Sequence, residues 1–247
     1  MENDVIILTY HHVAEPPPRV RIRGLYVTPA QFRRQIAWLK KKGARFRTFQ
    51  QLASRSRKKP GGSHRFDAVL TFDDGHLDNY SQAFPILRQF EIPAVVYPVV
   101  GDLGKQNIFW DQSVDKHPVN ILEPEHIIEM ANEGIEFGSH LMHHIHLTRQ
   151  EPDKQSWELK TSKAVLENIL QKPVFSVAYP YGDWDENVAD RAQKAGYRFG
   201  VTTSPGIAER TGNPWTLKRN AVKGSKFYHP LKFRRKMVRL LSAMNSV

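Results

Sequence analysis

The chain alternates short apolar runs of strand length with amphipathic stretches of helical length, and this pattern limits its fold more than any other feature. The apolar runs predict strands at Val5–Leu8, Ala68–Phe72, Ala94–Val100, Ile135–Phe137, Val174–Ala178 and Tyr197–Val201. The first three runs are continuously apolar, which is typical of parallel strands that are buried on both faces. The alternation therefore predicts an α/β fold of β/α repeats that closes, fully or partly, into a barrel.

Helices are predicted in the stretches between these strands. Thr28 and Pro29 provide an N-cap followed by proline at the first helical position, and apolar residues then recur at helical spacing as far as Gly43. Further helices are predicted at Asn79–Phe90, Glu125–Asn132, Ser156–Leu170 and Glu186–Lys194. A length of 247 residues suits one barrel of this kind, so we expect a single domain over residues 1–247.

Composition narrows both the chemistry and the partners. The chain has no cysteine, which excludes disulfide bonds, thiolate metal sites and a cysteine nucleophile, so any metal must be held by His, Asp and Glu. Its 36 Lys and Arg against 25 Asp and Glu give a formal charge of +11, which favours anionic partners. The sequence has no RNP-like motif, zinc finger or basic-helix pattern, so we expect no nucleic-acid partner.

The two ends of the chain bear on its location. The chain opens without a basic leader, and no apolar run reaches about 18 residues, so we expect a cytoplasmic protein with no signal peptide or transmembrane segment. A basic helix is predicted at about 229–244, and its cations lie mostly opposite an apolar face formed by Phe233, Met237, Leu240, Leu241 and Met244. This helix either packs on the domain or makes peripheral contact with an anionic membrane surface.

Two adjacent carboxylates follow the second predicted strand. Asp73 and Asp74 would repel each other at the end of a buried run unless a cation or a shared proton relieved them. Neighbouring residues of an extended chain point in different directions, so one carboxylate can bind a metal while the other faces the reacting atom. The alternative is a plain turn, because Asp-Gly is a common turn dipeptide.

Four histidines lie within seven residues, directly after the apolar run at 135–137. His140 and His144 stand four apart, so one helical turn would set both imidazoles on one face, a spacing that can chelate a single ion. His143 and His146 would then point elsewhere, as bystanders or supporting groups. The alternative is an incidental histidine-rich turn in solvent. One Asp with two His is a ligand set for Zn²⁺ or a similar divalent ion, with positions left open for water.

Two further strand ends carry polar or aromatic residues. Ala178–Gly182 is either a tight turn set by its proline and glycine, or a groove wall whose backbone N–H faces a developing oxyanion. His11 and His12 end the first strand, and alternation lets only one of them face the same side as the other motifs. For either histidine a purely structural role is the alternative.

Together these motifs resemble those of the polysaccharide deacetylase family, the NodB-like carbohydrate esterases, over roughly residues 5–222. Thr71–Gly75 matches the family's T-F-D-D-G motif, its most specific mark. His140–His144 matches H-S/T-x-x-H, and Ala178–Gly182 is similar to R-x-P-Y-G. The first strand ends in Tyr10–Val13, which resembles the Y-H-x-V of the branch that deacetylates exopolysaccharides.

The sequence departs from the family pattern at defined positions. Leu141 stands where the family has Ser or Thr, and Ala178 stands where it has Arg. The late D-x-x-x-W and L-x-H motifs are not recognisable. Similarity to the exopolysaccharide branch implies a rearranged order in which His11 supplies the general acid that a late His provides elsewhere. From its position, Arg219 is a candidate for the positive charge that Ala178 lacks.

The resemblance implies a distorted (β/α) barrel of the NodB-homology type and a hydrolase that removes N-acetyl groups from a sugar polymer or glycolipid. It implies one divalent ion on Asp74, His140 and His144, which we expect to be zinc, with cobalt or nickel as alternatives, and Asp73 as the general base. The residues expected to bind substrate are Tyr179, Pro180, Tyr181, Gly182 and Trp110.

Two other functions remain open at this level. A catalytically idle barrel of this family would bind an N-acetylated glycan without hydrolysing it. Alternatively, the same metal chemistry would serve another acyl amide or an acetyl ester.

Overall fold

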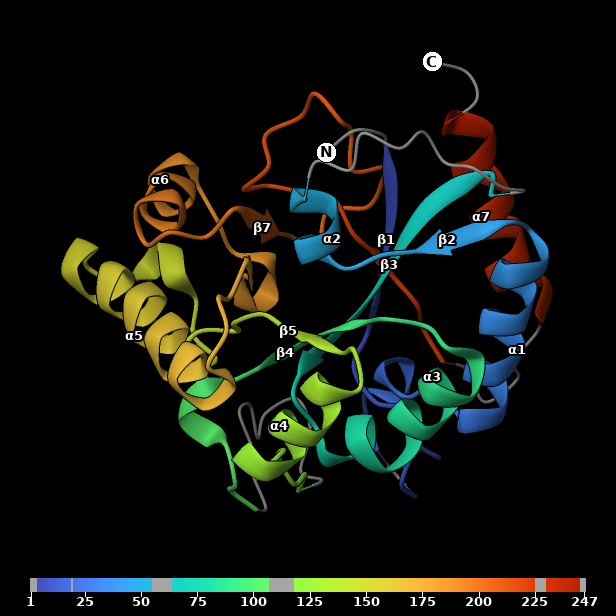
Figure 1. The fold of residues 1–247 in the computed structure, drawn as a ribbon, viewed down its shortest axis with the longest axis horizontal. Helices are drawn as coiled ribbons and strands as arrows, with labels where there is room; N and C mark the ends of the chain where they lie inside the picture. The colour runs from blue at the N-terminus through green and yellow to red at the C-terminus, as the bar shows by residue number, and fades with distance from the viewer. Residues whose placement is uncertain (1–3, 19, 55–63, 107–117, 225–229, 245–247) are drawn as a thin grey trace.

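A parallel six-stranded sheet runs through the centre of the molecule (Figure 1). The computed structural model describes residues 4–18, 20–54, 64–106, 118–224 and 230–244. The strand order is β5-β4-β3-β1-β8, and β2 pairs with β3 as well. The strands of this sheet are β1 (Val5–Tyr10), β2 (Ala44–Phe46), β3 (Phe66–Asp74), β4 (Val95–Pro98), β5 (Glu136–Phe137) and β8 (Asn220–Ala221).

A second, two-stranded sheet completes a ring. It pairs β6 (Ser176–Ala178) with β7 (Phe199–Val201), also in parallel. A parallel bridge from Ser139 to Val177 joins it to the end of β5, and another from Val201 to Leu217 joins it to the segment before β8. The ring formed by the two sheets is a distorted (β/α) barrel, as the strand–helix alternation predicts.

Helices surround this ring. They are α1 (Pro29–Lys41), α2 (Phe49–Ala53), α3 (Phe84–Phe90), α4 (Pro124–Asn132), α5 (Pro152–Leu170), α6 (Glu186–Lys194) and α7 (Pro230–Met244). One of them, α2, packs its Phe49 against the cluster of buried side chains inside the ring. Short 3₁₀ turns cover Arg23–Leu25, Val100–Asp102, Leu147–Arg149 and Pro180–Gly182. At the start of α1 the Thr28 hydroxyl accepts a hydrogen bond from the Gln31 backbone N–H, and the Gln31 side chain accepts one from the Thr28 N–H.

One predicted helix is divided in the structure. The stretch predicted as Asn79–Phe90 begins with a π-helical turn over Asn79–Ala83, and α3 starts only at Phe84. Pro85 is the second residue of α3 and has no N–H to donate to the preceding turn, so the change from π-helical to α-helical bonding lies beside it. The wide turn brings Asn79 and its neighbours to the carboxyl end of β3, which is where the candidate site lies.

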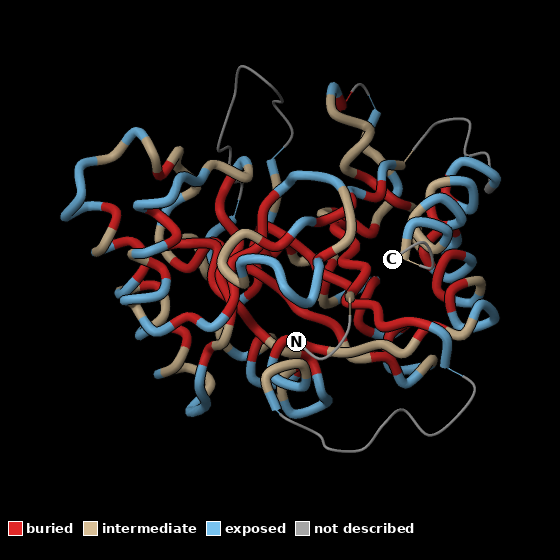
Figure 2. Tube along the Cα trace, turned by 90° about the horizontal axis from the view of Figure 1, so that it is seen from above, coloured by how far each residue is buried: buried red, intermediate tan, exposed pale blue. Residues whose placement is uncertain are grey.

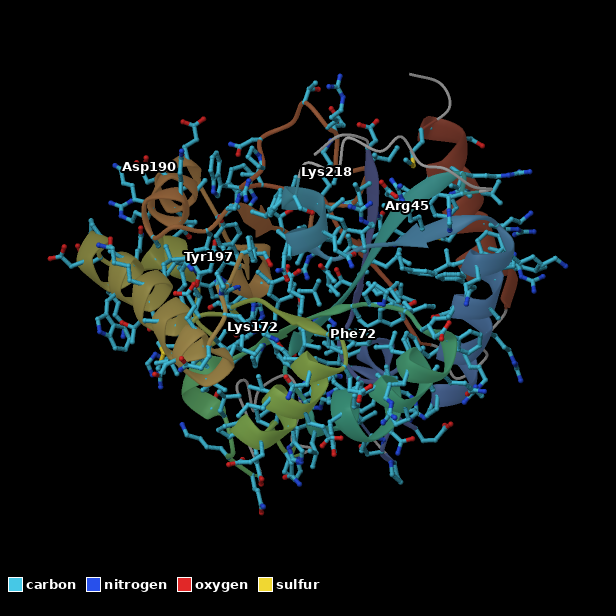
Figure 3. The ribbon with its side chains drawn as sticks, in the orientation of Figure 1. Arg45, Phe72, Lys172, Asp190, Tyr197 and Lys218 are labelled. Atoms are coloured by element: carbon cyan, nitrogen blue, oxygen red, sulfur yellow. The ribbon has the colours of Figure 1, made fainter. Side chains whose placement is uncertain are left out.

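Buried side chains form two layers, inside and outside the ring, and the buried trace occupies the centre of Figure 2. Along β3, Val69 packs inside the ring, whereas Leu70 and Phe72 pack outside it against the helices. Figure 3 labels Phe72 and shows it in the crowded centre. Because side chains alternate along a strand, Thr71 and Asp73 share the inward direction of Val69.

Helix α7 packs on the domain, as one of the two interpretations of the basic C-terminal segment expects. Phe233 and Met237 are buried, and Leu240, Leu241 and Met244 pack against the outer layer. Among the residues that the structure describes, no helix is both long and apolar enough to cross a membrane.

One half-buried carboxylate makes a testable contribution to stability. Glu136 on β5 accepts a hydrogen bond from the Gln50 backbone N–H at 2.7 Å, but burial outweighs this and raises its pKa to about 7. The folded state therefore holds the proton more tightly than the unfolded state, and this contribution to stability, complete below about pH 4.5, is lost as the pH rises through about 7.

Glu136→Gln removes this titration and keeps an acceptor for the Gln50 N–H. Relative to the wild type, the variant should gain about 2 kcal/mol in the free energy of unfolding between about pH 5 and about pH 8. Urea unfolding at the two pH values measures this gain. Glu125→Gln, at an exposed carboxylate, is the control and should show no such change. An unaltered pH profile in Glu136→Gln would contradict the assignment.

Candidate active site

The two carboxylates at the end of β3 point in different directions. Asp73 keeps the inward direction of its strand, whereas Asp74 has a positive φ of 75° and turns away. Gly75 continues this turn with φ of 75°, and a Cβ there would collide with Pro98 on β4. The Asp-Asp-Gly sequence thus ends the strand with one carboxylate inside the barrel and the other at its mouth.

Asp74 faces His140 and His144, and their ligand atoms all lie within 4.8 Å of one another. Asp74 Oδ1 is 3.5 Å from His140 Nε2 and 3.6 Å from His144 Nε2. This oxygen is buried and has no hydrogen-bond partner among the described residues. Such a carboxylate oxygen, converging with two imidazole nitrogens, fits a divalent cation of the Zn²⁺ type.

The two histidines differ in how readily they take up a proton: burial alone would lower the pKa of His140, but its contact with Asp74 and the charge of Asp73 raise it overall. His140 Nδ1 lies 2.7 Å from the Ala178 carbonyl, so Nδ1–H donates there and Nε2 is left toward Asp74. Burial lowers the pKa of His144 to about 4, which keeps its ring unprotonated at neutral pH. Burial by itself would raise the pKa of Asp74, but its contacts with His140 and His76 more than offset this and hold it well below 3.8.

The loop that carries the histidines is fixed by buried polar groups. Leu141 takes a positive φ of 65°, and its N–H donates to Ser139 Oγ at 2.9 Å. Glu158 on α5 is fully buried and accepts from the backbone N–H groups of Met142 and His143, each at 3.0 Å. The loop therefore obtains its support without the hydroxyl that the family has in place of Leu141.

Asp73 is held by a buried guanidinium. Arg219 donates to its two oxygens at 2.6 and 2.7 Å, to Thr71 Oγ1 at 3.1 Å and to the Thr202 carbonyl at 2.9 Å. Burial would raise the pKa of Asp73, but the charge and hydrogen bonds of Arg219 lower it overall, so the carboxylate stays ionised at neutral pH. Arg219 thus contacts Asp73 directly. On sequence alone it is a candidate for the positive charge that is lost because Ala178 stands in place of the family's arginine.

A supporting layer behind Asp74 was not anticipated from the sequence. His76 Nε2 lies 3.1 Å from Asp74 Oδ2, the oxygen that faces away from His140. The His76 ring stacks on His12 at 3.7 Å, and His12 stacks in turn on Tyr26 at 4.1 Å. His12 Nδ1 also lies 2.6 Å from a carboxylate oxygen of Asp78.

The two histidines at the end of β1 lie in different surroundings. His12 is buried in this supporting layer, whereas His11 is partly exposed and lies on the side of the carboxylates, close enough for a charge on its ring to lower the pKa of Asp73 and of Asp74. Asn79 donates to the His11 carbonyl at 2.8 Å and so fixes the backbone that carries this ring. Asp78, one residue earlier, accepts from the Val13 N–H at 2.8 Å.

Only some residues of the segment 179–182 lie beside the candidate metal ligands Asp74, His140 and His144. Tyr181 is 45% exposed, has φ of 59°, meets His144 edge-on at 4.5 Å and stacks on His146 at 4.1 Å. Gly182 has φ of 70°, and a Cβ there would collide with Thr203. Tyr181 therefore presents an open aromatic face next to a candidate metal ligand.

Tyr179 corrects our expectation of a substrate contact. Its side chain is fully buried, and its hydroxyl donates to the Trp215 carbonyl at 3.0 Å, so its ring packs in the core and lines no groove. The reason is strand alternation, which turns Tyr179 away from the mouth of the barrel. Pro180 is also buried. Trp110 lies outside the described residues.

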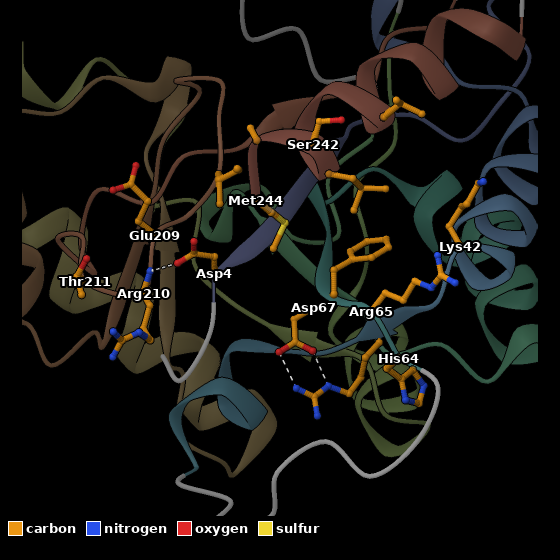
Figure 4. A pocket seen from close by; sticks show the side chains of 16 residues that line it. Asp4, Lys42, His64, Arg65, Asp67, Glu209, Arg210, Thr211, Ser242 and Met244 are labelled. Carbon is orange, nitrogen blue, oxygen red and sulfur yellow. Dashed lines mark hydrogen bonds and ion pairs between the residues drawn. The ribbon is translucent and has the colours of Figure 1, made fainter. Parts of the chain in front are cut away.

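A large cavity lies at the other end of the barrel (Figure 4). Its volume is about 900 Å³, and it is bordered by residues at the starts of β1 and β3, including Asp4 and Asp67, and by the end of α7. Arg45 and Asp67, which form an ion pair, both line it. Asp73 and Asp74 lie at the opposite end of β3, so this cavity is separate from the candidate site.

Solved structures share this architecture. BC0361, a polysaccharide deacetylase from Bacillus cereus, superimposes with a TM-score of 0.78 and 26% identity over 96% of this chain and 69% of that one. The Streptococcus pyogenes deacetylase PplD superimposes with a TM-score of 0.78 and 24% identity over 98% and 99% of the two chains. The barrel is therefore of the NodB-type deacetylase class.

Sequence comparison identifies the family. A family model of polysaccharide deacetylases matches residues 61–200. YxkH of Bacillus subtilis (strain 168), named as a polysaccharide deacetylase, is 30% identical over 218 residues, which are 87% of this chain and 70% of that protein. The poly-beta-1,6-N-acetyl-D-glucosamine N-deacetylase of Staphylococcus aureus (strain MRSA252) is 25% identical over 250 residues, 94% of this chain and 83% of that protein.

This chain belongs to the polysaccharide deacetylase family. It is a hydrolase that acts on carbon–nitrogen bonds other than peptide bonds.

Proposed function

We propose that this protein is a metal-dependent deacetylase that removes N-acetyl groups from a polymer of N-acetylated hexosamine, releasing acetate. The observation that carries the proposal is the pairing of two unlike carboxylates at the end of β3. Asp74 faces two imidazole nitrogens, and Asp73 is held ionised by Arg219 beside it. The named activity of the Staphylococcus aureus relative supports the choice of polymer.

In this proposal Asp74, His140 and His144 hold one divalent ion, for which zinc is the first candidate. When bound, the ion supplies Lewis-acid polarisation of the acetyl carbonyl and lowers the pKa of a water molecule toward neutrality. The contacts of Asp74 Oδ2 with His76 and of His140 Nδ1 with Ala178 orient the ligand atoms toward a common point.

Asp73 is the proposed general base. Arg219 keeps it unprotonated, which leaves it able to accept a proton from the attacking water at neutral pH. The bidentate contact also fixes the carboxylate in one orientation, since both oxygens are engaged. The same charge makes Asp73 a weaker base, so its contribution depends on a water whose own pKa has been lowered.

His11 is the proposed general acid, and Tyr181 the proposed sugar contact. An amine anion is a poor leaving group, so the departing nitrogen requires a proton, and His11 lies on the side of both carboxylates. The exposed ring of Tyr181 offers a flat face for a pyranose, and its backbone N–H is proposed to face the developing oxyanion.

Acetate release tests this function and separates it from the alternatives. The purified protein, stripped with a chelator and reloaded with zinc, should release acetate from poly-N-acetylglucosamine oligomers, and the stripped protein should not. An acetylated xylan serves as the ester substrate for comparison. Release from the ester alone would favour an O-deacetylase, and glycan binding without release from either substrate would favour an idle barrel.

A further inference from the structure

Helices α1 and α7 form one flank of the barrel. They lie side by side on the right of Figure 1, and the Trp38 ring meets Phe233 edge-on at 6.0 Å between them. Each helix buries one apolar side against the domain, Phe32 and Ile36 from α1 and Phe233 and Met237 from α7. Their remaining sides are turned to solvent.

The solvent sides of both helices carry only positive charge. Neither helix contains an acidic residue. All but one of their cations are exposed, Lys236 being half-buried. Together with Lys42, which caps α1, these cations make up the basic flank: Arg33, Arg34, Lys40, Lys41, Lys42, Lys232, Arg234, Arg235, Lys236 and Arg239. Outside this flank the Lys and Arg residues of the chain are almost balanced by its Asp and Glu residues, so nearly all of the net charge of +11 comes from the flank.

This charge is not neutralised by the protein itself. Within the described ranges, none of the cations of the basic flank forms an ion pair with a carboxylate. Their contacts are with neutral groups: Lys40 Nζ donates to the Phe90 carbonyl at 3.0 Å, and Lys236 Nζ to the Ala221 carbonyl at 2.8 Å. Burial and the nearby charge of Lys223 lower the pKa of Lys236. Crowded, uncompensated cations of this kind favour an extended anionic partner.

Apolar side chains between the cations indicate which anionic partner fits. Leu231 is 43% exposed and Val238 is 50% exposed, and their spacing of seven places them on one side of α7. A hollow in the same helix is lined by Lys232, Arg235, Lys236, Arg239 and Leu240. Lipid headgroups with acyl chains beneath them satisfy cations and apolar side chains together.

Single-stranded nucleic acid fits the basic flank less well, because such binding relies on exposed aromatic rings between the cations. The large exposed aromatic side chains of the described residues are Trp157, Tyr181 and Trp184, and none of them lies on α1 or α7.

We propose that the basic flank is a docking surface for an anionic lipid bilayer. The protein would lie with α1 and α7 against the headgroups and with Leu231 and Val238 at the acyl boundary. Asp73 and Asp74 lie at the mouth of the barrel and not on this flank, so docking leaves the candidate site free of the lipid. This surface is independent of the proposed deacetylase activity.

Vesicle sedimentation tests the proposal directly. The full chain should bind phosphatidylcholine vesicles that contain phosphatidylglycerol and should not bind pure phosphatidylcholine vesicles. Binding should fall steeply with added sodium chloride, because exposed charges are screened. Soluble polyuridylate, added as a competitor at equal negative charge, should displace the protein only weakly.

Charge-reversal variants locate the surface. The triple variant Lys232→Glu, Arg235→Glu and Arg239→Glu should bind the anionic vesicles at least about 100-fold more weakly. A matched control reverses the same number of exposed cations on the other side of the barrel, with Lys160→Glu, Lys172→Glu and Arg198→Glu, and should bind nearly as well as the wild type. Figure 3 labels Lys172 on that side.

Two further double variants test whether the loss of binding comes from misfolding or from a general change of charge. Arg34→Glu with Lys41→Glu tests the flank from α1, and Leu231→Ser with Val238→Ser tests the apolar contribution without changing charge. Both should weaken vesicle binding while the circular dichroism spectrum is retained. The proposal is overturned if the wild type ignores anionic vesicles, if the control triple loses as much affinity as the α7 triple, or if polyuridylate binds more tightly than the vesicles do.

Discussion

Replacing Asp73 with Asn should lower kcat for acetate release by about 1000-fold, because the amide cannot accept a proton from the attacking water. Zinc affinity should stay close to that of the wild type, since Asp73 is not among the three groups that converge on one point. Steady-state assays of acetate release, with zinc titrations by calorimetry on the same preparations, measure both quantities. Near-full activity in this variant would remove Asp73 from the proposed mechanism.

The same strand offers a matched control for this variant. Asp67, six residues earlier on β3, is also buried and is also held at both oxygens by a guanidinium, that of Arg45. Asp67→Asn breaks a similar ion pair at the far end of the strand, and so it should lower the free energy of unfolding without lowering kcat. A drop in kcat for both variants would show that the loss follows stability and not proton transfer.

Replacing His144 or His140 with Ala should weaken zinc binding by at least about 100-fold, since even groups that only support a ligand commonly contribute 10- to 100-fold. Acetate release at limiting zinc should fall with it. Equilibrium dialysis of chelator-stripped protein against zinc measures the affinity. The stripped variants should retain the unfolding midpoint of the stripped wild type within a few degrees.

His143 provides the control within the same loop. Its side chain is turned toward Glu158, with Nδ1 2.7 Å from Oε1, and Lys154 Nζ lies 3.0 Å from the same oxygen. His143→Ala therefore leaves Glu158 with other partners and should preserve zinc affinity. If His143→Ala lost as much affinity as His144→Ala, the ligand assignment would be wrong.

The sequence predicts most of the architecture because the barrel strands are continuous apolar runs. The carboxyl ends of parallel strands meet at one end of a barrel, so polar residues that follow such runs are expected to come together there. Asp74, His140 and His144 do come together in this way. The β2 and β8 strands were not predicted, because Ala44–Phe46 contains an arginine and Asn220–Ala221 begins with an asparagine, so neither forms an apolar run.

The supporting contacts could not be predicted for a different reason. His76 touches Asp74 two residues away, but its stacking on His12 depends on the pairing of β1 with β3. Glu158 reaches the histidine loop from a helix, and no spacing in the sequence relates the two. Tyr179 is a residue for which the sequence predicted a contact that the structure does not have. Its aromatic ring suggested a sugar contact, but its position after β6 places the ring in the core.

The pairing of the first strand with the last has a consequence for the order of the motifs. Leu8 on β1 is paired in register with Asn220 on β8, and Val5 is bridged to Ala208, so the beginning and the final third of the chain are neighbours in space. A circular permutation of the gene across this junction would relocate His11 in the sequence and leave its surroundings unaltered. In the proposed mechanism, an early histidine such as His11 and a late one would therefore reach the same side of the site by two different orders of the chain.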